Sequence, residues 1–293
     1  MMPTFGGQSM WGRLNRVILC NPSTAGWSNP SRAARWSELG YWHTLDATTA
    51  ENQHHQLRQH LQDADVEILD LPRSTGLSLD AVYAHDASFI TDRGAVLMRM
   101  GKSARTTEPT HHATLYEALK IPIVGAIIEP GTLEAGDIVW LDSETLLVGR
   151  SYRTNQTGIN QLRSLLAPSG IEVIEAPLPH GQGPAACLHL MSLVSVLDAH
   201  DILVDRAWLA VQTVELLTEK GFNLIEIDPD ERDSLACNVV ALGNRRLIAL
   251  EENPKTIERM QKVGFEVKTI AGTELCQNGS GGPTCLTRPV LRS

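Results

Sequence analysis

The chain has 293 residues, of which 42% are apolar, 20% are charged and 5% are aromatic, and its net charge at pH 7 is −9 with histidine neutral. This composition excludes a disordered or collagen-like chain, and the acidic balance argues against a nucleic-acid groove or an anionic membrane surface while favouring a cationic ligand. Because neither an apolar run of about 18 residues nor a signal-peptide core occurs, we expect a cytoplasmic protein with no membrane or nucleic-acid partner.

Helical patterns alternate with short apolar strands along the chain. The predicted helices cover residues 50–64, 110–119, 157–167, 206–220 and 254–263, and the strands that follow them cover 66–71, 121–124, 171–174, 222–227 and 265–270. Between these units lie four β-hairpin patterns, each with a polar residue, an apolar run, a polar turn and a second apolar run. The hairpins argue against a Rossmann-type alternation, and the sequence contains no GxGxxG or P-loop string.

The polar residues that lead the hairpins recur at a nearly constant interval. They are Asp86, Asp137, His189 and Asn238, spaced by 51, 52 and 49 residues, and a further step of 47 reaches Cys285. Such a period is typical of a repeat architecture, in which equivalent positions meet around an axis. We therefore predict one domain of five units in which these five side chains face one another. The alternative is that all five are ordinary polar residues at strand entries.

A thiol beside a histidine can act as a nucleophile with its general acid/base. Cys285 follows the glycine-rich residues 278–284, which suit close approach of backbone and ligand, although an exposed turn with an incidental thiol is the alternative. His189 lies in an apolar run, where a hydrogen-bonded core histidine is the alternative.

We expect the remaining cysteines and the paired histidines to have no catalytic or metal-binding role. The five cysteines suggest neither a disulfide framework nor a CxxC site; we expect Cys20, Cys187 and Cys237 in the core and leave Cys276 undecided. Adjacent histidines in a helix point to different faces and do not form a metal clamp, so we place the pairs 54–55 and 111–112 on the surface.

Several carboxylates gather near the hairpin entries. Asp80, Asp86 and Glu134, with His85, would supply negative charge to one end of the sheet array, and a planar guanidinium could satisfy two of the carboxylates at once. For Asp137, hydrogen bonding to backbone amides at a hairpin entry is the favoured interpretation.

Five short motifs, in order and spread over nearly the whole chain, carry a family resemblance. They are DAVYAHD at 80–86, LEAGD at 133–137, GRSYRTN at 149–155, LHLMS at 188–192 and GGPTC at 281–285. The chain resembles the guanidino-group-modifying, or pentein, superfamily, and within it the dimethylarginine dimethylaminohydrolases. The resemblance implies an α/β fold, a five-fold pseudosymmetric α/β propeller, with residues 1–293 as a single catalytic domain of five ββαβ-type repeats.

The resemblance also implies roles for individual residues. Cys285 matches the nucleophile, His189 the general acid/base and Glu134 the carboxylate that supports it. The matched substrate-binding residues are Asp86, which grips the guanidinium, Asp80, and the arginines Arg105 and Arg153, which bind the amino-acid end. His85 departs from the family, because a second acid usually stands there. Residue 191 is methionine, where arginine deiminases and amidinotransferases typically carry an acid.

The implied activity is hydrolysis of a guanidine C–N bond in a small cationic substrate, most simply an N-methylated arginine, through a covalent S-alkyl thiouronium intermediate. No cofactor or metal is required. Arginine deiminase, arginine dihydrolase or amidinotransferase activity is the alternative on the same fold. A third hypothesis is a non-catalytic binding propeller, and the presence of Cys285, His189 and Glu134 together argues against it. The oligomeric state stays open, with a homodimer as one option.

Overall fold

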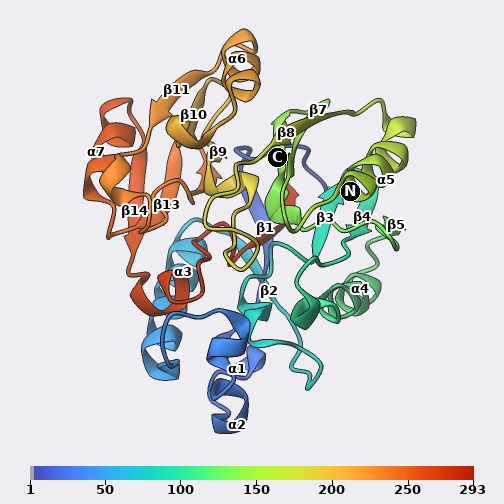
Figure 1. The fold of residues 1–293 in the computed structure, drawn as a ribbon, viewed down its shortest axis with the longest axis vertical. Helices are drawn as coiled ribbons and strands as arrows, with labels where there is room; N and C mark the ends of the chain where they lie inside the picture. The colour runs from blue at the N-terminus through green and yellow to red at the C-terminus, as the bar shows by residue number, and fades with distance from the viewer. Residues whose placement is uncertain (1–2) are drawn as a thin grey trace.

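Fifteen strands form five separate sheets of three strands each in the computed structural model, which describes residues 3–293. Figure 1 shows the sheets arranged around a central axis, with helices on the outside of the ring. This arrangement confirms the predicted five-fold pseudosymmetric α/β propeller. The prediction that residues 1–293 form a single catalytic domain stays a prediction.

Four of the sheets share one connectivity, in which a hairpin is followed by a helix and a third strand. The first two strands pair antiparallel, and the third pairs parallel with the second. Parallel neighbours need a crossover, and the helix provides it. The units are β3 (Ser88–Thr91), β4 (Gly94–Leu97), α4 (Glu108–Ala118) and β5 (Ile123–Ala126); β6 (Ile138–Asp142), β7 (Thr145–Arg150), α5 (Gln156–Leu166) and β8 (Glu172–Pro177); β9 (Val194–Val196), β10 (Asp201–Val204), α6 (Val211–Glu219) and β11 (Asn223–Glu226); β12 (Val240–Gly243), β13 (Arg246–Leu250), α7 (Pro254–Lys262) and β14 (Glu266–Ile270).

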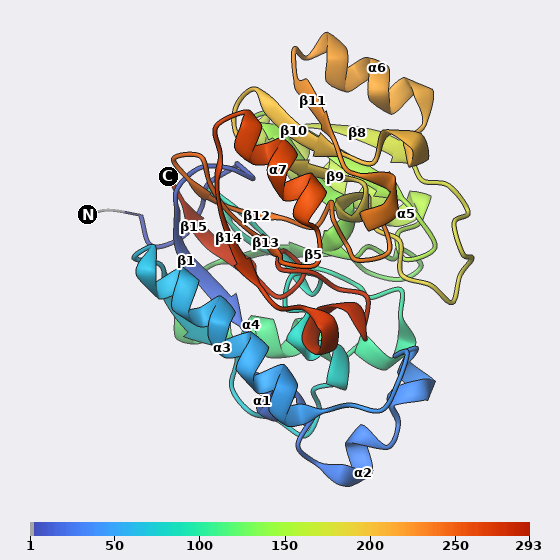
Figure 2. The same ribbon diagram turned by 90° about the vertical axis from the view of Figure 1, so that its left-hand side faces the viewer.

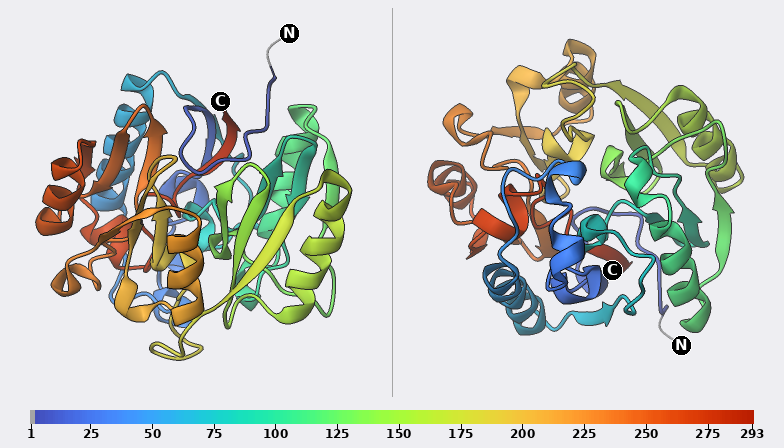
Figure 3. Two further views of the ribbon diagram at one scale, coloured as in Figure 1. Left: turned by 90° about the horizontal axis from the view of Figure 1, so that it is seen from above. Right: turned by 60° about the horizontal axis from the view of Figure 1, so that its bottom comes forward.

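The fifth sheet joins the two ends of the described chain. β15 (Arg288–Arg292) pairs antiparallel with β1 (Leu14–Leu19), and β1 pairs parallel with β2 (Glu67–Asp70) across α3 (Ala47–Asp63). The short helices α1 (Pro22–Ala25) and α2 (Pro30–Ala33) lie in the connection from β1 to α3. Figures 2 and 3 show β15 beside β1, so the C-terminal strand closes the ring with the N-terminal one.

Each outer helix covers its sheet with an apolar face. In α5, Ile159, Leu162 and Leu166 are buried at the spacing that puts side chains on one side of a helix. The predicted helix 206–220 is too long, because residues 206–208 form a separate 3-10 turn and the backbone at Leu209 is extended before α6 begins.

Two of the four histidines predicted on the surface are buried. His54 and His112 are each 1% exposed, and burial lowers their pKa values to about 4 and about 3. His54 lies on the inward face of α3 with Ala50, Leu57 and Leu61, and the His112 ring is within 2.9 Å of the Ser88 hydroxyl. The surface prediction is wrong for these two, because helix packing decides which of two adjacent histidines turns inward.

Across residues 3–293, no helix combines the length and the apolar character needed to cross a membrane.

Candidate active site

The residues that lead the five repeats converge at one end of the ring. Asp86, Asp137, His189, Asn238 and Cys285 each precede the first strand of a sheet. The Asn238 Nδ2 group donates to Cys285 Sγ over 3.1 Å, and His189 Nδ1 lies 3.8 Å from Asp86 Oδ1. The spacing of the repeats therefore brings together side chains that are about 50 residues apart in sequence.

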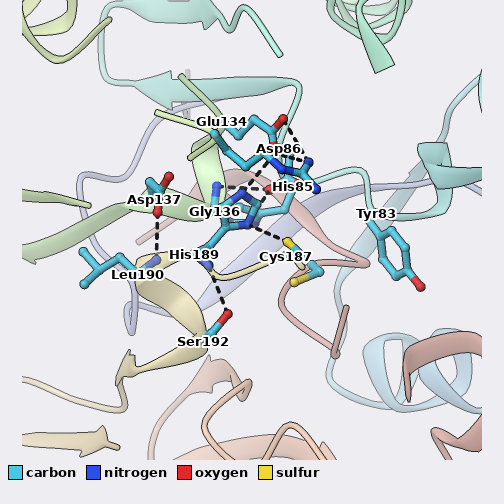
Figure 4. Close-up of polar contacts among 12 residues, drawn as sticks. Tyr83, His85, Asp86, Glu134, Gly136, Asp137, Cys187, His189, Leu190 and Ser192 are labelled. Carbon is cyan, nitrogen blue, oxygen red and sulfur yellow. Dashed lines mark hydrogen bonds and ion pairs between the residues drawn. The ribbon is translucent and has the colours of Figure 1, made fainter. Parts of the chain in front are cut away.

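His189 occupies a turn rather than the strand that the apolar run suggested. It caps the 3-10 turn Leu190–Ser192, its backbone N–H donates to Ser192 Oγ, and β9 begins only at Val194. The Nε2 atom lies 3.0 Å from Glu134 Oε2. Figure 4 shows the ring near Glu134, Asp86 and Cys187.

The charges around His189 favour its protonated form. Burial alone would lower the pKa of the imidazole, but Cys187, Asp86 and Asp137 raise it well above its ordinary value. The same contact with His189, together with Arg153, holds the pKa of Glu134 well below its usual range in spite of burial. The pair therefore exists as a carboxylate and an imidazolium at neutral pH.

Asp137 holds the histidine turn in place. Its Oδ1 accepts from the Leu190 N–H over 2.8 Å, and its Oδ2 accepts from the Ser151 hydroxyl over 2.6 Å. Burial raises the pKa of this carboxyl, because it is fully enclosed. These contacts agree with the interpretation of Asp137 as a hydrogen-bonding residue at a hairpin entry, and they fix the residue next to His189.

Cys285 lies beside this charge network. Burial raises the pKa of its thiol to about 12 and the Asp86 carboxylate adds to the rise, whereas His189 and the Asn238 amide oppose it. The thiol is therefore neutral at pH 7 in the absence of a further cation. We call Asp86, Glu134, His189 and Cys285 the Cys285 cluster.

Arg105 is held inside the protein by two carboxylates. Its Nη1 atom lies 2.5 Å from Asp86 Oδ2, its Nη2 atom lies 2.8 Å from Glu108 Oε2, and Nη2 also donates to the Tyr83 carbonyl. The side chain is almost fully buried. These contacts place the positive charge of Arg105 against Asp86 and Glu108, and the role of Arg105 at the amino-acid end of a substrate stays a prediction.

Arg153 and Asp80 also have partners within the protein. The Nη1 atom of Arg153 lies 3.3 Å from Glu134 Oε2, and the remaining donors of its guanidinium have no hydrogen-bond partner among residues 3–293. Asp80 Oδ2 forms a 2.5 Å ion pair with Lys102 Nζ, while the Lys102 backbone N–H donates to Glu134 Oε1. Lys102 thus links the two carboxylates, and no sequence motif predicted this connection.

His85 turns toward the centre of the ring. Its Nδ1 atom lies 2.7 Å from the Thr287 carbonyl oxygen, and its Nε2 atom lies 3.4 Å from Arg288 Nη2. Burial and Arg288 hold its pKa well below the ordinary value, so the ring is neutral. His85 therefore lies in the core around the axis, and its role in substrate binding stays a prediction.

Gly136 allows the Cys285 cluster to pack closely. Its N–H donates to Asp86 Oδ1 over 3.1 Å, and a Cβ atom at this position would lie 2.4 Å from His189 Nδ1. No side chain fits in that space, so the contact between His189 and Asp86 requires glycine here.

Cys187 is a second thiol at the site, contrary to the prediction of a core position. Its Sγ atom lies 3.7 Å from His189 Nδ1, and the residue is only partly buried. The spacing could have revealed this, since residues i and i+2 of an extended segment share a face. Cys20, Cys237 and Cys276 are buried in the core.

A cavity of about 490 Å³ adjoins the cluster. Cys187 and Asn238, which contact His189 and Cys285 respectively, form part of its wall, and Trp42, Trp208 and Arg232 also line it. A cavity of this size suits a small organic molecule. A ligand in it would reach the Cys285 cluster past Cys187 and Asn238.

The cluster also contains a set of donors that a metal ion could use. Oxygens of Asp86 and Glu134 and a ring nitrogen of His189 lie within 4.8 Å of one another. Both carboxylates already face a guanidinium, from Arg105 and Arg153 respectively. The arrangement is that of a protonated histidine between two carboxylates.

Comparison with known proteins gives a consistent result. Residues 38–292 match the model of the family described as N,N dimethylarginine dimethylhydrolase, eukaryotic. The N(G),N(G)-dimethylarginine dimethylaminohydrolase of Pseudomonas aeruginosa is 28% identical over 242 residues, which cover 83% of this chain and 89% of that enzyme.

Two solved structures extend the similarity to the fold. A mutant of the Pseudomonas aeruginosa enzyme complexed with citrulline superposes with a TM-score of 0.76 at 27% identity, covering 94% of this chain and 99% of that chain. The N-terminal domain of ArgZ, an arginine dihydrolase from Cyanobacteria, superposes with a TM-score of 0.80 at 20% identity, covering 94% and 97%.

Proposed function

Because this chain belongs to the dimethylarginine dimethylaminohydrolase family, it is a hydrolase acting on C–N bonds, and we propose that it converts an N-methylated arginine to citrulline and the methylated amine. The observation that carries the proposal is the Cys285 cluster itself. Two carboxylates and an imidazole lie within 4.8 Å of one another beside a thiol, and a guanidinium is the cation that two carboxylates recognise best.

Asp86 is the residue that we assign to the substrate guanidinium. In the structure its Oδ2 accepts from Arg105 and its Oδ1 from the Gly136 N–H, and a carboxylate has further lone pairs for a second cation. Arg153 keeps free donors beside Glu134, which supports its assignment to the carboxylate of the substrate. The cavity wall at Cys187 and Asn238 gives the route by which the substrate enters.

The substrate itself activates the thiol. A guanidinium bound to Asp86 adds positive charge beside Cys285 and screens the carboxylate that raises the thiol pKa, so both effects favour the thiolate. The Asn238 N–H, 3.1 Å from Sγ, stabilises the negative charge.

The reaction then takes two steps. The Cys285 thiolate attacks the central guanidinium carbon, the imidazolium of His189 gives its proton to the departing amine, and breaking of that C–N bond leaves the S-alkyl thiouronium. The neutral His189 next removes a proton from water, whose oxygen adds to the same carbon. Collapse breaks the C–S bond, the hydroxyl proton of the adduct passes to solvent as the C=O bond forms, and the ureido product leaves with Cys285 as thiolate. Glu134 holds the imidazolium, and proton transfer of this kind contributes about 10²–10⁴-fold.

The test uses the two thiols that lie near His189. Cys285→Ser should abolish formation of citrulline while the circular dichroism spectrum stays unchanged, whereas the matched variant Cys187→Ser should retain most of the turnover. Reaction with chloroacetamidine at neutral pH should label the wild type and Cys187→Ser at one site, and leave Cys285→Ser unlabelled. The reverse pattern would make Cys187 the nucleophile and overturn the assignment.

A second candidate function, arginine deiminase, arginine dihydrolase or amidino transfer, keeps the same covalent intermediate. The placement of His85 favours this second function, because His85 is bonded to the Thr287 carbonyl and supplies no second acid beside Asp86. Met191 argues against this second function, because it is buried in the core and supplies no acid for an unsubstituted nitrogen. Mass spectrometry after incubation with arginine, monomethylarginine, dimethylarginine and agmatine distinguishes citrulline, ornithine with ammonia, and a new amidino compound.

A further inference from the structure

Two arginines of β15 point into the middle of the ring. Arg288 and Arg292 are four residues apart on one strand, where alternate side chains share a face, and they are 5% and 6% exposed. We call them the axial arginine pair. The mechanism uses neither residue.

The axial arginine pair has only neutral partners. Arg288 Nη1 donates to the carbonyls of Ser88 (2.6 Å) and His85 (3.2 Å), and Arg292 Nη1 donates to those of Gly12 (2.6 Å) and Ala241 (2.9 Å). Within residues 3–293 no carboxylate forms an ion pair with either guanidinium, and Arg288 Nε is buried without a hydrogen-bond partner.

Within the described part of the chain, two like charges are thus enclosed without an ion-paired carboxylate, and the Asp86 carboxylate acts on Arg288 only from beyond hydrogen-bond distance. Burial lowers the pKa of Arg288 to about 10, and burial together with Arg288 lowers that of Arg292 to about 9, so both stay protonated at neutral pH. An enclosed charge without a partner is strongly unfavourable, and an ion of opposite sign relieves it. The neighbouring His85 is neutral and donates from Nδ1 to the Thr287 carbonyl, so it supplies no negative charge.

Room for such an ion exists beside the guanidinium groups. A cavity of about 20 Å³ is lined by both arginines, and a second of about 10 Å³ is lined by Arg292 and His85. A cavity needs roughly 10–15 Å³ to hold one water molecule, so the larger one accepts a single small ion and excludes sulfate or a carboxylic acid. Phe89, Ile138 and Trp140 form its apolar walls.

The N-terminal segment covers this space from one side. The Gly6 N–H donates to the Val290 carbonyl, the Arg292 N–H donates to the Gly6 carbonyl, and Met10 lines both cavities. Figure 3 shows the segment running beside β15 at the centre of the ring. An ion held there is shielded from solvent and would enter when this segment opens.

We propose that the axial arginine pair binds one small inorganic monoanion of the size of chloride. The site is separate from the Cys285 cluster, and its ligand is a structural counter-ion that stabilises the closed ring. Its affinity depends on both guanidinium groups, because the cavity offers the ion no other charge.

The thermal midpoint of the full chain tests the proposal in sodium chloride, bromide and gluconate at equal ionic strength. We expect a midpoint roughly 4 °C higher in either halide than in gluconate, since gluconate is too large for the cavity. In Arg292→Met the difference should disappear, and in His85→Glu, which places a carboxylate beside Arg288, it should shrink. Arg150→Met, which removes an exposed arginine of β7, should keep it.

A direct measurement on the wild type makes the test independent of how the variants fold. Chloride NMR should show a ³⁵Cl line broadened by the protein and narrowed again by added bromide. Equal wild-type midpoints in all three salts with no excess broadening, or a halide gain that survives in Arg292→Met, would overturn the proposal.

Discussion

The Cys285 cluster and the axial arginine pair bury positive charge in opposite ways. At the cluster, Arg105 lies against Asp86 and Glu108, and Arg153 lies against Glu134. At the axis, Arg288 and Arg292 donate only to neutral acceptors within residues 3–293. A buried charge that has carboxylate partners is costly to remove, whereas one that lacks them is costly to keep. The same substitution should therefore destabilise the protein strongly at the cluster and only slightly at the axis.

The first prediction compares the replacement of a buried arginine by methionine at the two kinds of site. Arg105→Met should lower the free energy of unfolding by about 3–5 kcal/mol, because it leaves Asp86 and Glu108 buried without their cation. Arg292→Met in halide-free buffer should change it by less than about 1 kcal/mol, since the loss of two hydrogen bonds is offset by removal of an unpaired charge. Urea unfolding measures both; equal losses would erase the distinction between the sites.

The second prediction removes the negative charge of Glu134 from the Cys285 cluster. Glu134→Gln keeps the shape but removes the charge that faces His189 and Arg153, and we expect kcat to fall by about 10²–10⁴-fold. Steady-state assays measure this. The matched control is Glu129→Gln, where an exposed carboxylate pairs with Arg99 over 3.6 Å and kcat should not change.

The free energy of unfolding should depend on pH differently in the wild type and in Glu134→Gln. The folded pKa of Glu134 lies below its unfolded value of 4.5, so its contribution is present above pH 4.5 and is lost as the pH falls through the folded pKa. The gap in unfolding free energy between wild type and Glu134→Gln should therefore narrow below pH 4.5. A gap that stays constant down to pH 2.5 would show that Glu134 is not held as a carboxylate.

The third prediction concerns the close packing of the cluster. Gly136→Ala places a methyl group within 2.4 Å of the present position of His189 Nδ1, so the ring must move. A displacement of about 1 Å costs roughly 10²-fold in rate, and we expect kcat to fall by that amount with little change in the fold. Gly170→Ala is the control for kinetics only, because a Cβ there meets nothing within 4 Å, although the backbone φ of +71° strains alanine and should lower stability. Undiminished turnover in Gly136→Ala would show that catalysis does not depend on the contact between His189 and Asp86.

The repeats and the leading polar residues were predictable because a fixed period in sequence becomes a fixed position around the axis. Asn238 and Cys285 illustrate this, since they meet at 3.1 Å through their register alone. The partners of Arg105 and His85 were not predictable, because a long side chain can reach several groups and its choice depends on loops from other repeats. The core position predicted for Cys187 is wrong for a different reason: it rests on the hydrophobic neighbours of Cys187, whereas the two-residue spacing from His189 indicates that both side chains share a face.

The smallest effect on catalysis is expected at Asp137, whose carboxylate raises the pKa of His189 and has no cationic partner among residues 3–293. Asp137→Asn keeps an oxygen for the Leu190 N–H but turns an amide toward the Ser151 hydroxyl, whose oxygen already accepts from the Arg153 and Thr154 N–H groups, so a loss of about 1–3 kcal/mol in stability accompanies the kinetic effect. It removes one of the negative charges that raise the pKa of His189, and the alkaline limb of kcat/KM should therefore move to lower pH by a few tenths of a unit to about one unit. Asp142→Asn, whose carboxylate pairs with Lys220 at the surface, serves as the charge-matched control. An alkaline limb that moves equally in both variants would assign the shift to net charge rather than to the charge that Asp137 places beside His189.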